Sequence, residues 1–253
     1  MSYHPILESE IKEWYFDALE DDGVIDALAA RHDIKDFYRD KYRSTIKAGR
    51  ATKPDESFDT SHAFYAAVVQ GFFRTYFYIR GGAYSFVIDE NPDYARYTKP
   101  WPEILGREIA QTVRNRISEN YCGGVYIPVD QVAHLLADIE SDARINACLK
   151  MGVFAGGTLE IFLKALRHAQ SGGFGLLEAT EVVEPNPLDL NSSKSYSNLF
   201  HCDREGPLLY AGIAARQIAE AMAQSKVEEV KEAKEKETKT GGFFSNLFRK
   251  KRR

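Results

Sequence analysis

The stretch TSHAFYAAVVQGFFRTYFYI, residues 60–79, is the most apolar segment of the chain, and it decides what kind of core the protein builds. Up to Phe73 its apolar side chains recur at helical spacing, which predicts a buried core helix. Residues 75–79 are aromatic and β-branched, which is typical of a strand. Residues 81–88 look like a glycine turn that enters a strand, so helix and strand both stay open at this end.

Upstream of this stretch, residues 5–50 have the pattern of a helical region. Apolar residues recur at helical spacing up to Leu19, and the turn formed by residues 21–23 ends that run. Asp33 is a plausible N-cap for a later helix, whose aromatic and aliphatic residues up to Ile46 are spaced by three and four. Residues 47–57 are polar and loop-like.

Downstream, the chain alternates helices with short strands. Residues 89–102 should be irregular, and Pro102 suits the first turn of a helix that reaches about Asn120. Residues 125–127 are a strand candidate, after which Pro128 and Asp130 open a helix. The buried stripe of that helix is Val132, Leu135, Leu136 and Ile139.

The last part of the body repeats this order. We expect a helix over residues 158–169 that is closed by glycines, a strand over residues 174–183, and a polar loop over residues 184–203. A final helix follows Gly206-Pro207. The fold class is therefore mixed α+β and helix-rich, a small sheet with helices packed around it. The expected parts are a domain over 1–224, a Lys/Glu tether over 225–240 and an amphipathic tail over 241–253.

Composition narrows the class of protein. The chain has 253 residues, 44% hydrophobic and 12% aromatic, which is enough for a full core. No apolar run approaches the roughly 20 residues of a membrane-spanning helix, and the N-terminus lacks the pattern of an export signal. Cys122, Cys148 and Cys202 are too scattered for a disulfide framework. We therefore expect a cytoplasmic protein with reduced thiols.

The net charge of −4 is unevenly divided. Residues 225–253 hold ten Lys/Arg against five Glu, which leaves 23 basic and 32 acidic residues in 1–224. The body thus carries about −9 and the tail about +5. An acidic body argues against nucleic acid as its main ligand, because affinity for phosphate comes from Lys and Arg. A basic protein partner suits it better.

The triplet His201-Cys202-Asp203 ends the polar loop just before the final helix. It is a weak catalytic candidate, because neighbouring side chains on an extended chain point to opposite sides and a base would have to come from elsewhere. The favoured interpretation is that Asp203 caps the helix and that Cys202 is a small core residue. The turn at Gly156-Gly157, which opens a helix, is the other enzymatic candidate, although Thr158 as an N-cap explains it without a ligand.

Two carboxylate patterns are weaker still. His134 and Asp138 are four residues apart on one helix, but no third or fourth ligand is evident, so we expect a hydrogen-bonded surface pair and no metal. Glu178, Glu181 and Glu184 fit the solvated edge of a strand. No cofactor is expected.

The tail is the most informative segment. Gly241-Gly242 should break the Lys/Glu segment, and the apolar residues that follow fall on one helical face, with five cations behind them. The residues of this amphipathic tail are Phe243, Phe244, Leu247, Phe248, Arg249, Lys250, Lys251, Arg252 and Arg253. Two interpretations are equally favoured. Either the tail docks on an anionic membrane or in a partner groove, or it only keeps the chain soluble.

Together these patterns favour a non-enzymatic interaction protein of a bacterial accessory or toxin-neutralising type. Its acidic body would bind a protein partner, and its tail would hold it at the inner face of the membrane. The alternative is a hydrolase or transferase built on the Cys202/His201 loop or on the Gly156-Gly157 turn.

Overall fold

The computed structural model describes residues 1–51, 62–106, 117–118, 121–122, 124–180 and 182–249; residues 117–118, 121–122, 227 and 229–249 are described by their backbone alone. It divides into two units, Met1–Tyr210 and Ala211–Arg253, which are described separately. The second unit consists of the continuation of one helix, α11 (Glu205–Arg249).

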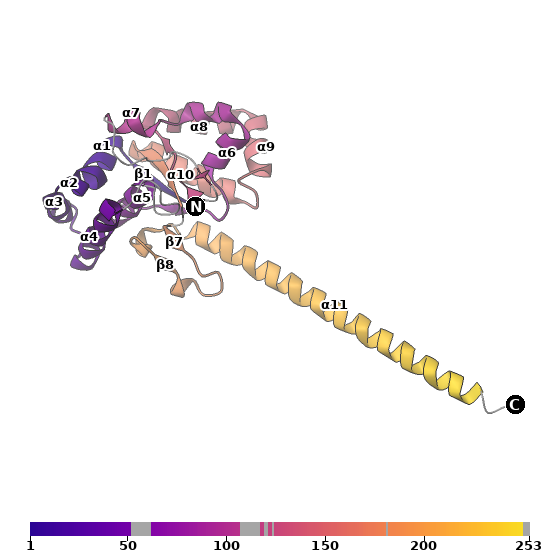
Figure 1. The fold of residues 1–253 in the computed structure, drawn as a ribbon. Helices are drawn as coiled ribbons and strands as arrows, with labels where there is room; N and C mark the ends of the chain where they lie inside the picture. The colour runs from indigo at the N-terminus through magenta and orange to yellow at the C-terminus, as the bar shows by residue number, and fades with distance from the viewer. Residues whose placement is uncertain (52–61, 107–116, 119–120, 123, 181, 250–253) are drawn as a thin grey trace. The chain divides into compact units, whose positions relative to one another are not determined.

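A four-stranded antiparallel sheet lies at the centre of the first unit (Figure 1). Its strand order is β2-β1-β6-β5. The strands are β1 (Ser2–Ile6), β2 (Phe77–Tyr78), β5 (Tyr126–Ile127) and β6 (Gly175–Ala179). Every residue of these strands is buried, which requires that both faces of the sheet be covered.

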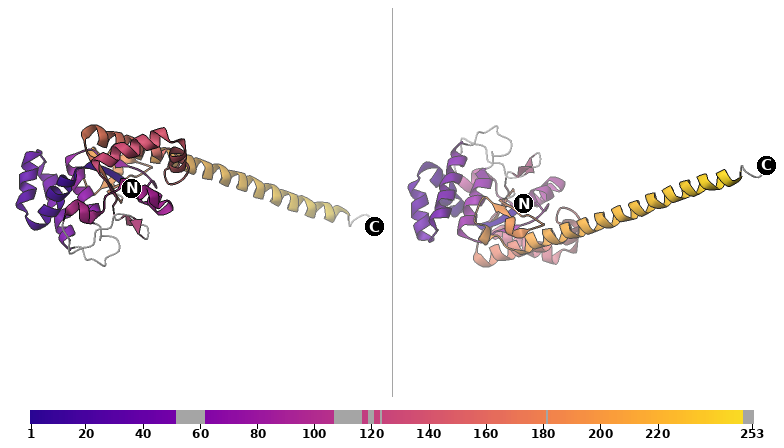
Figure 2. Two further views of the ribbon diagram at one scale, coloured as in Figure 1. Left: turned by 90° about the horizontal axis from the view of Figure 1, so that it is seen from above. Right: turned by 90° about the horizontal axis from the view of Figure 1, so that it is seen from below.

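Helices cover the two faces separately, and the sheet side chains alternate between the two resulting cores. Ile6, Tyr78, Tyr126 and Leu177 belong to the first core; Tyr3, Phe77, Ile127 and Leu176 belong to the second. Figure 2 shows the two groups of helices from further sides. The first core is built with α1 (Glu8–Ile11), the π-helical η1 (Lys12–Asp17), α2 (Ala18–Glu20), α3 (Gly23–Arg31), α4 (Asp36–Ala51), α5 (His62–Phe73) and α7 (Trp101–Leu105).

The second core is built mostly from later helices. They are α6 (Tyr84–Glu90), the 3-10 helix η2 (Pro92–Tyr97), α8 (Val129–Ser141), α9 (Ala143–Met151) and α10 (Thr158–Gly172). Two short hairpins and two 3-10 turns complete the first unit: β3 (Ile117–Ser118) with β4 (Tyr121–Cys122), β7 (Val183–Glu184) with β8 (Lys194–Ser195), η3 (Leu190–Ser192) and η4 (Leu199–His201).

The mixed α+β, helix-rich fold is confirmed. The stripe Val132, Leu135, Leu136 and Ile139 is buried on α8, and the helix at Thr158 closes at Gly173 in the left-handed region with φ 68°. The strand expected over 174–183 is present as β6 and, after a break, β7. Near residue 80, where the sequence left helix and strand open, the structure has the strand β2 followed by the helix α6.

Four expectations are wrong. Residues 2–6 form a central strand, where the sequence indicated helix from residue 5. Asp33 is no N-cap, because its φ is 51° and α4 begins at Asp36. The helix opened by Pro102 ends at Leu105, where Gly106 adopts the left-handed conformation, and residues 117–118 are a strand. Gly241-Gly242 does not interrupt α11, which continues to Arg249.

Candidate functional site

The backbone of the triplet His201-Cys202-Asp203 is held beside Tyr76 by two hydrogen bonds. The Tyr76 amide donates to the carbonyl of His201 at 3.0 Å, and the Asp203 amide donates to the carbonyl of Tyr76 at 2.8 Å. This is a short parallel strand pairing, and in an extended chain successive side chains point to opposite sides. The local fold therefore separates the three side chains.

Each side chain of the triplet has its own partners. His201 Nδ1 donates to the carbonyl of Gly71 at 3.0 Å. Asp203 Oδ2 forms an ion pair with Lys164 at 2.7 Å, and its Oδ1 accepts from the Glu205 amide at 3.1 Å, which is the capping role expected from the sequence. The triplet thus joins α10 to the start of α11.

The thiol of Cys202 is buried and contacts no base. It lies 3.5 Å from the carbonyl of Asp203, and burial raises its pKa to about 12, with the Asp203 charge as a smaller cause. A thiol with this pKa is protonated at neutral pH, whereas a nucleophile must be a thiolate. This geometry supports the interpretation of Cys202 as a small core residue.

The glycine turn before α10 is a backbone feature. Gly157 is the N-cap, with φ 92°, and Gly156 has φ 69°. The expected N-cap, Thr158, lies one residue further on, and its hydroxyl donates back to the carbonyl of Ala155 at 2.9 Å. Both glycines occupy the left-handed region, which explains their presence without a ligand.

Glu178 is not at a solvated edge; only 1% of its surface is exposed. Its carboxylate accepts from the hydroxyls of Tyr3 and Ser85 and from the Tyr84 amide, so it binds the first turn of α6 to the sheet. Glu184 is exposed, and Glu181 lies outside the described residues.

The carboxylate of Asp138 also differs from expectation. It accepts a hydrogen bond from the Tyr97 hydroxyl and lies 3.6 Å from Arg96 Nη2, with no bond to His134. Across the described ranges, His, Cys, Asp and Glu side chains do not gather in groups of three that fit a metal ion.

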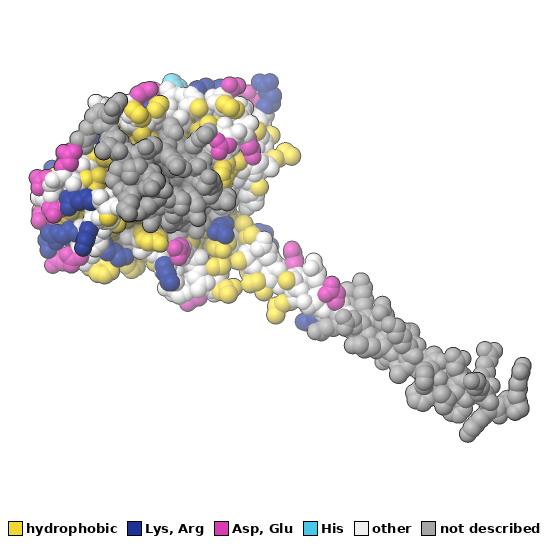
Figure 3. All heavy atoms as spheres, in the orientation of Figure 1, with side chains coloured by type: hydrophobic (Ala, Val, Ile, Leu, Met, Phe, Trp, Pro, Cys, Tyr) yellow, Lys and Arg dark blue, Asp and Glu magenta, His cyan; other side chains and the backbone are white. Residues whose placement is uncertain are grey.

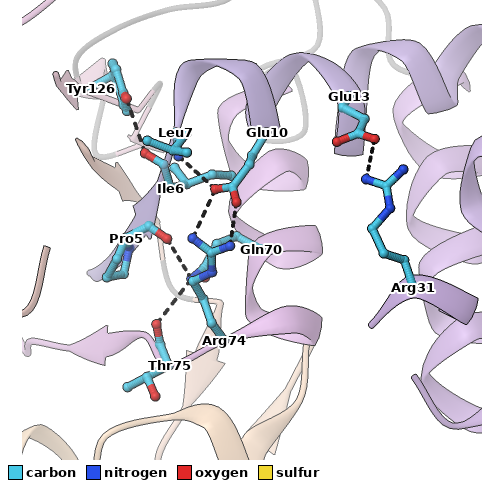
Figure 4. Close-up of polar contacts among 10 residues, drawn as sticks. All are labelled: Pro5, Ile6, Leu7, Glu10, Glu13, Arg31, Gln70, Arg74, Thr75 and Tyr126. Carbon is cyan, nitrogen blue, oxygen red and sulfur yellow. Dashed lines mark hydrogen bonds and ion pairs between the residues drawn. The ribbon is translucent and has the colours of Figure 1, made fainter. Parts of the chain in front are cut away.

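A second polar network joins β1 to α1 and α5 (Figure 4). Arg74 donates to both oxygens of Glu10, at 3.0 and 2.5 Å, and its guanidinium lies over the rings of Trp14 and Phe174. Gln70 donates to the carbonyls of Pro5 and Thr75 at 3.1 and 3.2 Å. Figure 4 shows these groups pointing at one another, so the network has a structural role.

One cavity of the first unit, about 490 Å³ in volume, lies between α4, α5 and the hairpin strand β8. It is lined by Lys41, Ser44, Thr45, Ala48, Phe64, Tyr65, Val68, Ser195 and Tyr196. No sequence pattern points to this site. Helical spacing identifies the buried face of α4, but the residues that line the cavity come from three distant segments that only the tertiary fold brings together.

The tail candidates are only partly described. Phe243, Phe244, Leu247, Phe248 and Arg249 belong to α11 by their backbone, and their side chains lie outside the described residues. Lys250, Lys251, Arg252 and Arg253 lie wholly outside them, as does the side chain of Cys122. In the part of the chain that the structure describes, none of the helices has the combination of length and hydropathy needed for a membrane crossing.

Comparison with models of protein families, with curated proteins and with solved structures found no match for this chain.

Proposed function

We propose that this chain is an interaction protein whose acidic body binds a basic protein partner and whose C-terminal segment docks on an anionic membrane surface. The observation that carries the proposal is the continuity of α11, which is helical from Glu205 to Arg249. Helical geometry is what gathers the apolar residues of the segment on one side.

The geometry of the segment follows from its sequence and this backbone. At about 100° per residue, positions 243, 247, 244 and 248 fall at about 0°, 40°, 100° and 140°. Ser245 and Asn246 take the opposite side. Such a face suits the boundary between lipid headgroups and acyl chains, where aromatic rings are favoured.

Five cations follow this face directly, Arg249 to Arg253. Each Lys or Arg near an anionic surface contributes about 1 kcal/mol of attraction, and the attraction weakens as salt rises. One short apolar face binds membranes only marginally, so stable docking takes both terms. The two signals are adjacent in this chain, which supports membrane docking over simple solubilisation.

Two features of the body favour binding to a protein partner: its net charge and an exposed aromatic side chain. Residues 1–224 carry about −9, which steers a basic partner toward it. Over α3 and α4, Lys/Arg and Asp/Glu side chains are interspersed (Figure 3), as in the ion pair of Arg43 with Asp26. Phe200 is 90% exposed on η4, and exposed aromatic rings are typical anchors of protein interfaces.

The enzymatic alternative receives less support. The Cys202 thiol is buried with a raised pKa, and the imidazole of His201 is bonded to a backbone carbonyl. A nucleophile needs a hydrogen-bonded base, and these two groups do not form that pair.

Co-sedimentation with phosphatidylserine-containing vesicles tests the membrane part. The intact chain should pellet with the vesicles, and F243S/F244S/F248S or replacement of Arg249–Arg253 by Gln should each release it. The matched control replaces the five tether lysines by Gln, which removes the same charge away from the aromatic face: Lys226, Lys231, Lys234, Lys236 and Lys239. This control should keep most of the binding.

An intact chain that remains in the supernatant with anionic vesicles contradicts membrane docking. Equal loss in the control and in the Arg249–Arg253 variant would mean that net charge alone acts. Binding of the 241–253 peptide to a protein, unaffected by lipid charge, would instead point to a helix-in-groove mode.

A further inference from the structure

The cavity beside α4 has the size of a small-molecule site. Its volume of about 490 Å³ falls within the roughly 300–1,000 Å³ of typical ligand pockets. Phe64, Tyr65 and Val68 of α5 are buried and form its floor. Residues of one face of α4 line one side, and Ser195 with Tyr196 lines another.

The floor and one wall of the cavity are aromatic. The rings of Phe64 and Tyr196 meet edge to face, with centroids 5.5 Å apart and an interplanar angle of 80°. Tyr196 is half exposed, so a ligand that packs against both rings would remove apolar surface from water. This surface favours a flat or branched apolar body over a sugar or a polyphosphate.

Lys41 contributes the only charge among the described residues that line the cavity. Its ammonium donates to the carbonyl of Ser195 at 3.3 Å and lies 5.3 Å from the centroid of the Phe37 ring. No carboxylate of the described chain pairs with it, since Asp36 and Asp40 are bonded to Arg39 and Arg43. Lys41 therefore retains N–H groups for an anion.

The serine and threonine hydroxyls at the cavity already donate to backbone carbonyls. Ser44 and Thr45 donate to the carbonyls of Asp40 and Lys41, both at 2.9 Å, and Ser195 donates to the carbonyl of Val182 at 3.2 Å. A single cation beside an apolar pocket matches a ligand that carries one negative charge.

We propose that this cavity binds a small aromatic monocarboxylate, with its ring packed against Phe64 and Tyr196 and its carboxylate on Lys41. The site is independent of the membrane-docking segment. A ligand with several anionic groups fits poorly, because the described lining offers one cation.

Isothermal titration of the full chain with 1-naphthoate and with its uncharged analogue 1-naphthamide tests the proposal. Naphthoate should bind about tenfold more tightly, because a charge-assisted hydrogen bond adds affinity that the amide lacks. Lys41→Gln should remove this difference. The matched control is Lys47→Gln, an exposed residue of the same helix that does not line the cavity, and it should leave both affinities unchanged.

A second variant tests the location. Ala48→Trp places a ring over the cavity from an exposed helical position and should abolish binding of both probes, with circular dichroism to check that the chain stays folded. Equal affinity for naphthoate and naphthamide, absence of naphthoate binding, or an unchanged affinity in Lys41→Gln would each overturn the proposal. If Ala48→Trp does not fold, the comparison of Lys41→Gln with Lys47→Gln still tests whether Lys41 binds the carboxylate.

Discussion

Glu178 on β6 and His4 on β1 are polar side chains in the middle of the sheet, and both are buried. Each is tied to a helix: Glu178 to the first turn of α6, and His4 through its Nδ1 to Gln70 of α5 at 2.6 Å. Buried polar groups of this kind are costly unless they are bonded, so they fix which helix packs on which face.

Glu178→Gln tests this role. In the variant, the amide places N–H groups where hydroxyl and backbone donors already point, so the free energy of unfolding should fall by about 1–3 kcal/mol. Chemical denaturation measures it. Glu184→Gln, the same change at an exposed strand residue, should stay within about 0.5 kcal/mol of the wild-type chain. Similar effects of the two substitutions would contradict the assignment.

His4 makes stability depend on pH. Burial lowers its pKa from the ordinary 6.5 to about 3, against a smaller opposite effect of its bond to Gln70. Between these values the unfolded chain binds a proton that the folded chain does not, so lower pH favours unfolding. His4 should therefore cost about 1.4 kcal/mol of stability between pH of about 7.5 and 5.5.

His4→Asn should reduce the pH dependence by that amount when urea unfolding is measured at both pH values. Other groups, such as the exposed histidines, contribute equally to both proteins and cancel in the comparison. If the two proteins show the same pH dependence, His4 is charged in the folded state or reached by water.

Cys202 should be unreactive in the folded protein. Its thiol is buried with a pKa raised to about 12, whereas Cys148 is exposed. Mass spectrometry after brief alkylation at neutral pH should find Cys148 modified and Cys202 intact until denaturant is added. Rapid modification of Cys202 in the folded protein would instead support a role for this residue as a nucleophile.

At the scale of elements, the helices with a clear apolar period were predictable, whereas strand β1 and helix α6 were not. The stripe on α8 reads directly from its sequence because one face is apolar. β1 escapes prediction because Ser2, His4 and Pro5 are atypical of a central strand. Their polar groups are satisfied by tertiary bonds, such as Gln70 to the carbonyl of Pro5, which no local pattern reveals.

The helix α6 was not predictable for the opposite reason. Its residues YSFVI favour a strand locally, but the carboxylate of Glu178, 94 residues from Tyr84, accepts from the backbone amide at its start. A negative charge at a helix N-terminus stabilises the helix. The candidate cavity was unpredictable on similar grounds, because Lys41, Phe64 and Tyr196 meet only in the tertiary fold.

Two glycines of α11 should respond oppositely to substitution. A Cβ at Gly206 would lie 1.8 Å from the carbonyl oxygen of Tyr78, so Gly206→Ala should destabilise the body by at least about 1–3 kcal/mol. A Cβ at Gly212 meets nothing, so Gly212→Ala should raise helix content or leave stability unchanged. Thermal unfolding and circular dichroism compare the two, and equal effects would contradict the contact.

At the scale of the whole molecule, the structure separates a two-core body from the continuation of α11. Independent folding of residues 1–224 remains a prediction. A chain that ends at Gln224 should unfold within about one or two degrees of the intact protein, because the sequence pattern of buried apolar residues ends before the tether. A loss of several degrees would show that the tail packs on the body.

Residues 241–253 are proposed to hold the protein on anionic membranes. The most direct measurement is the partition coefficient onto phosphatidylserine-containing vesicles of the intact chain and of one that ends at Thr240, each at about 0.1 and 1 M salt, where the Debye length is about 10 and 3 Å. We expect binding of the intact chain that weakens at high salt, and none of the shortened chain. Equal partitioning of the two chains, or no binding of either, would contradict the account.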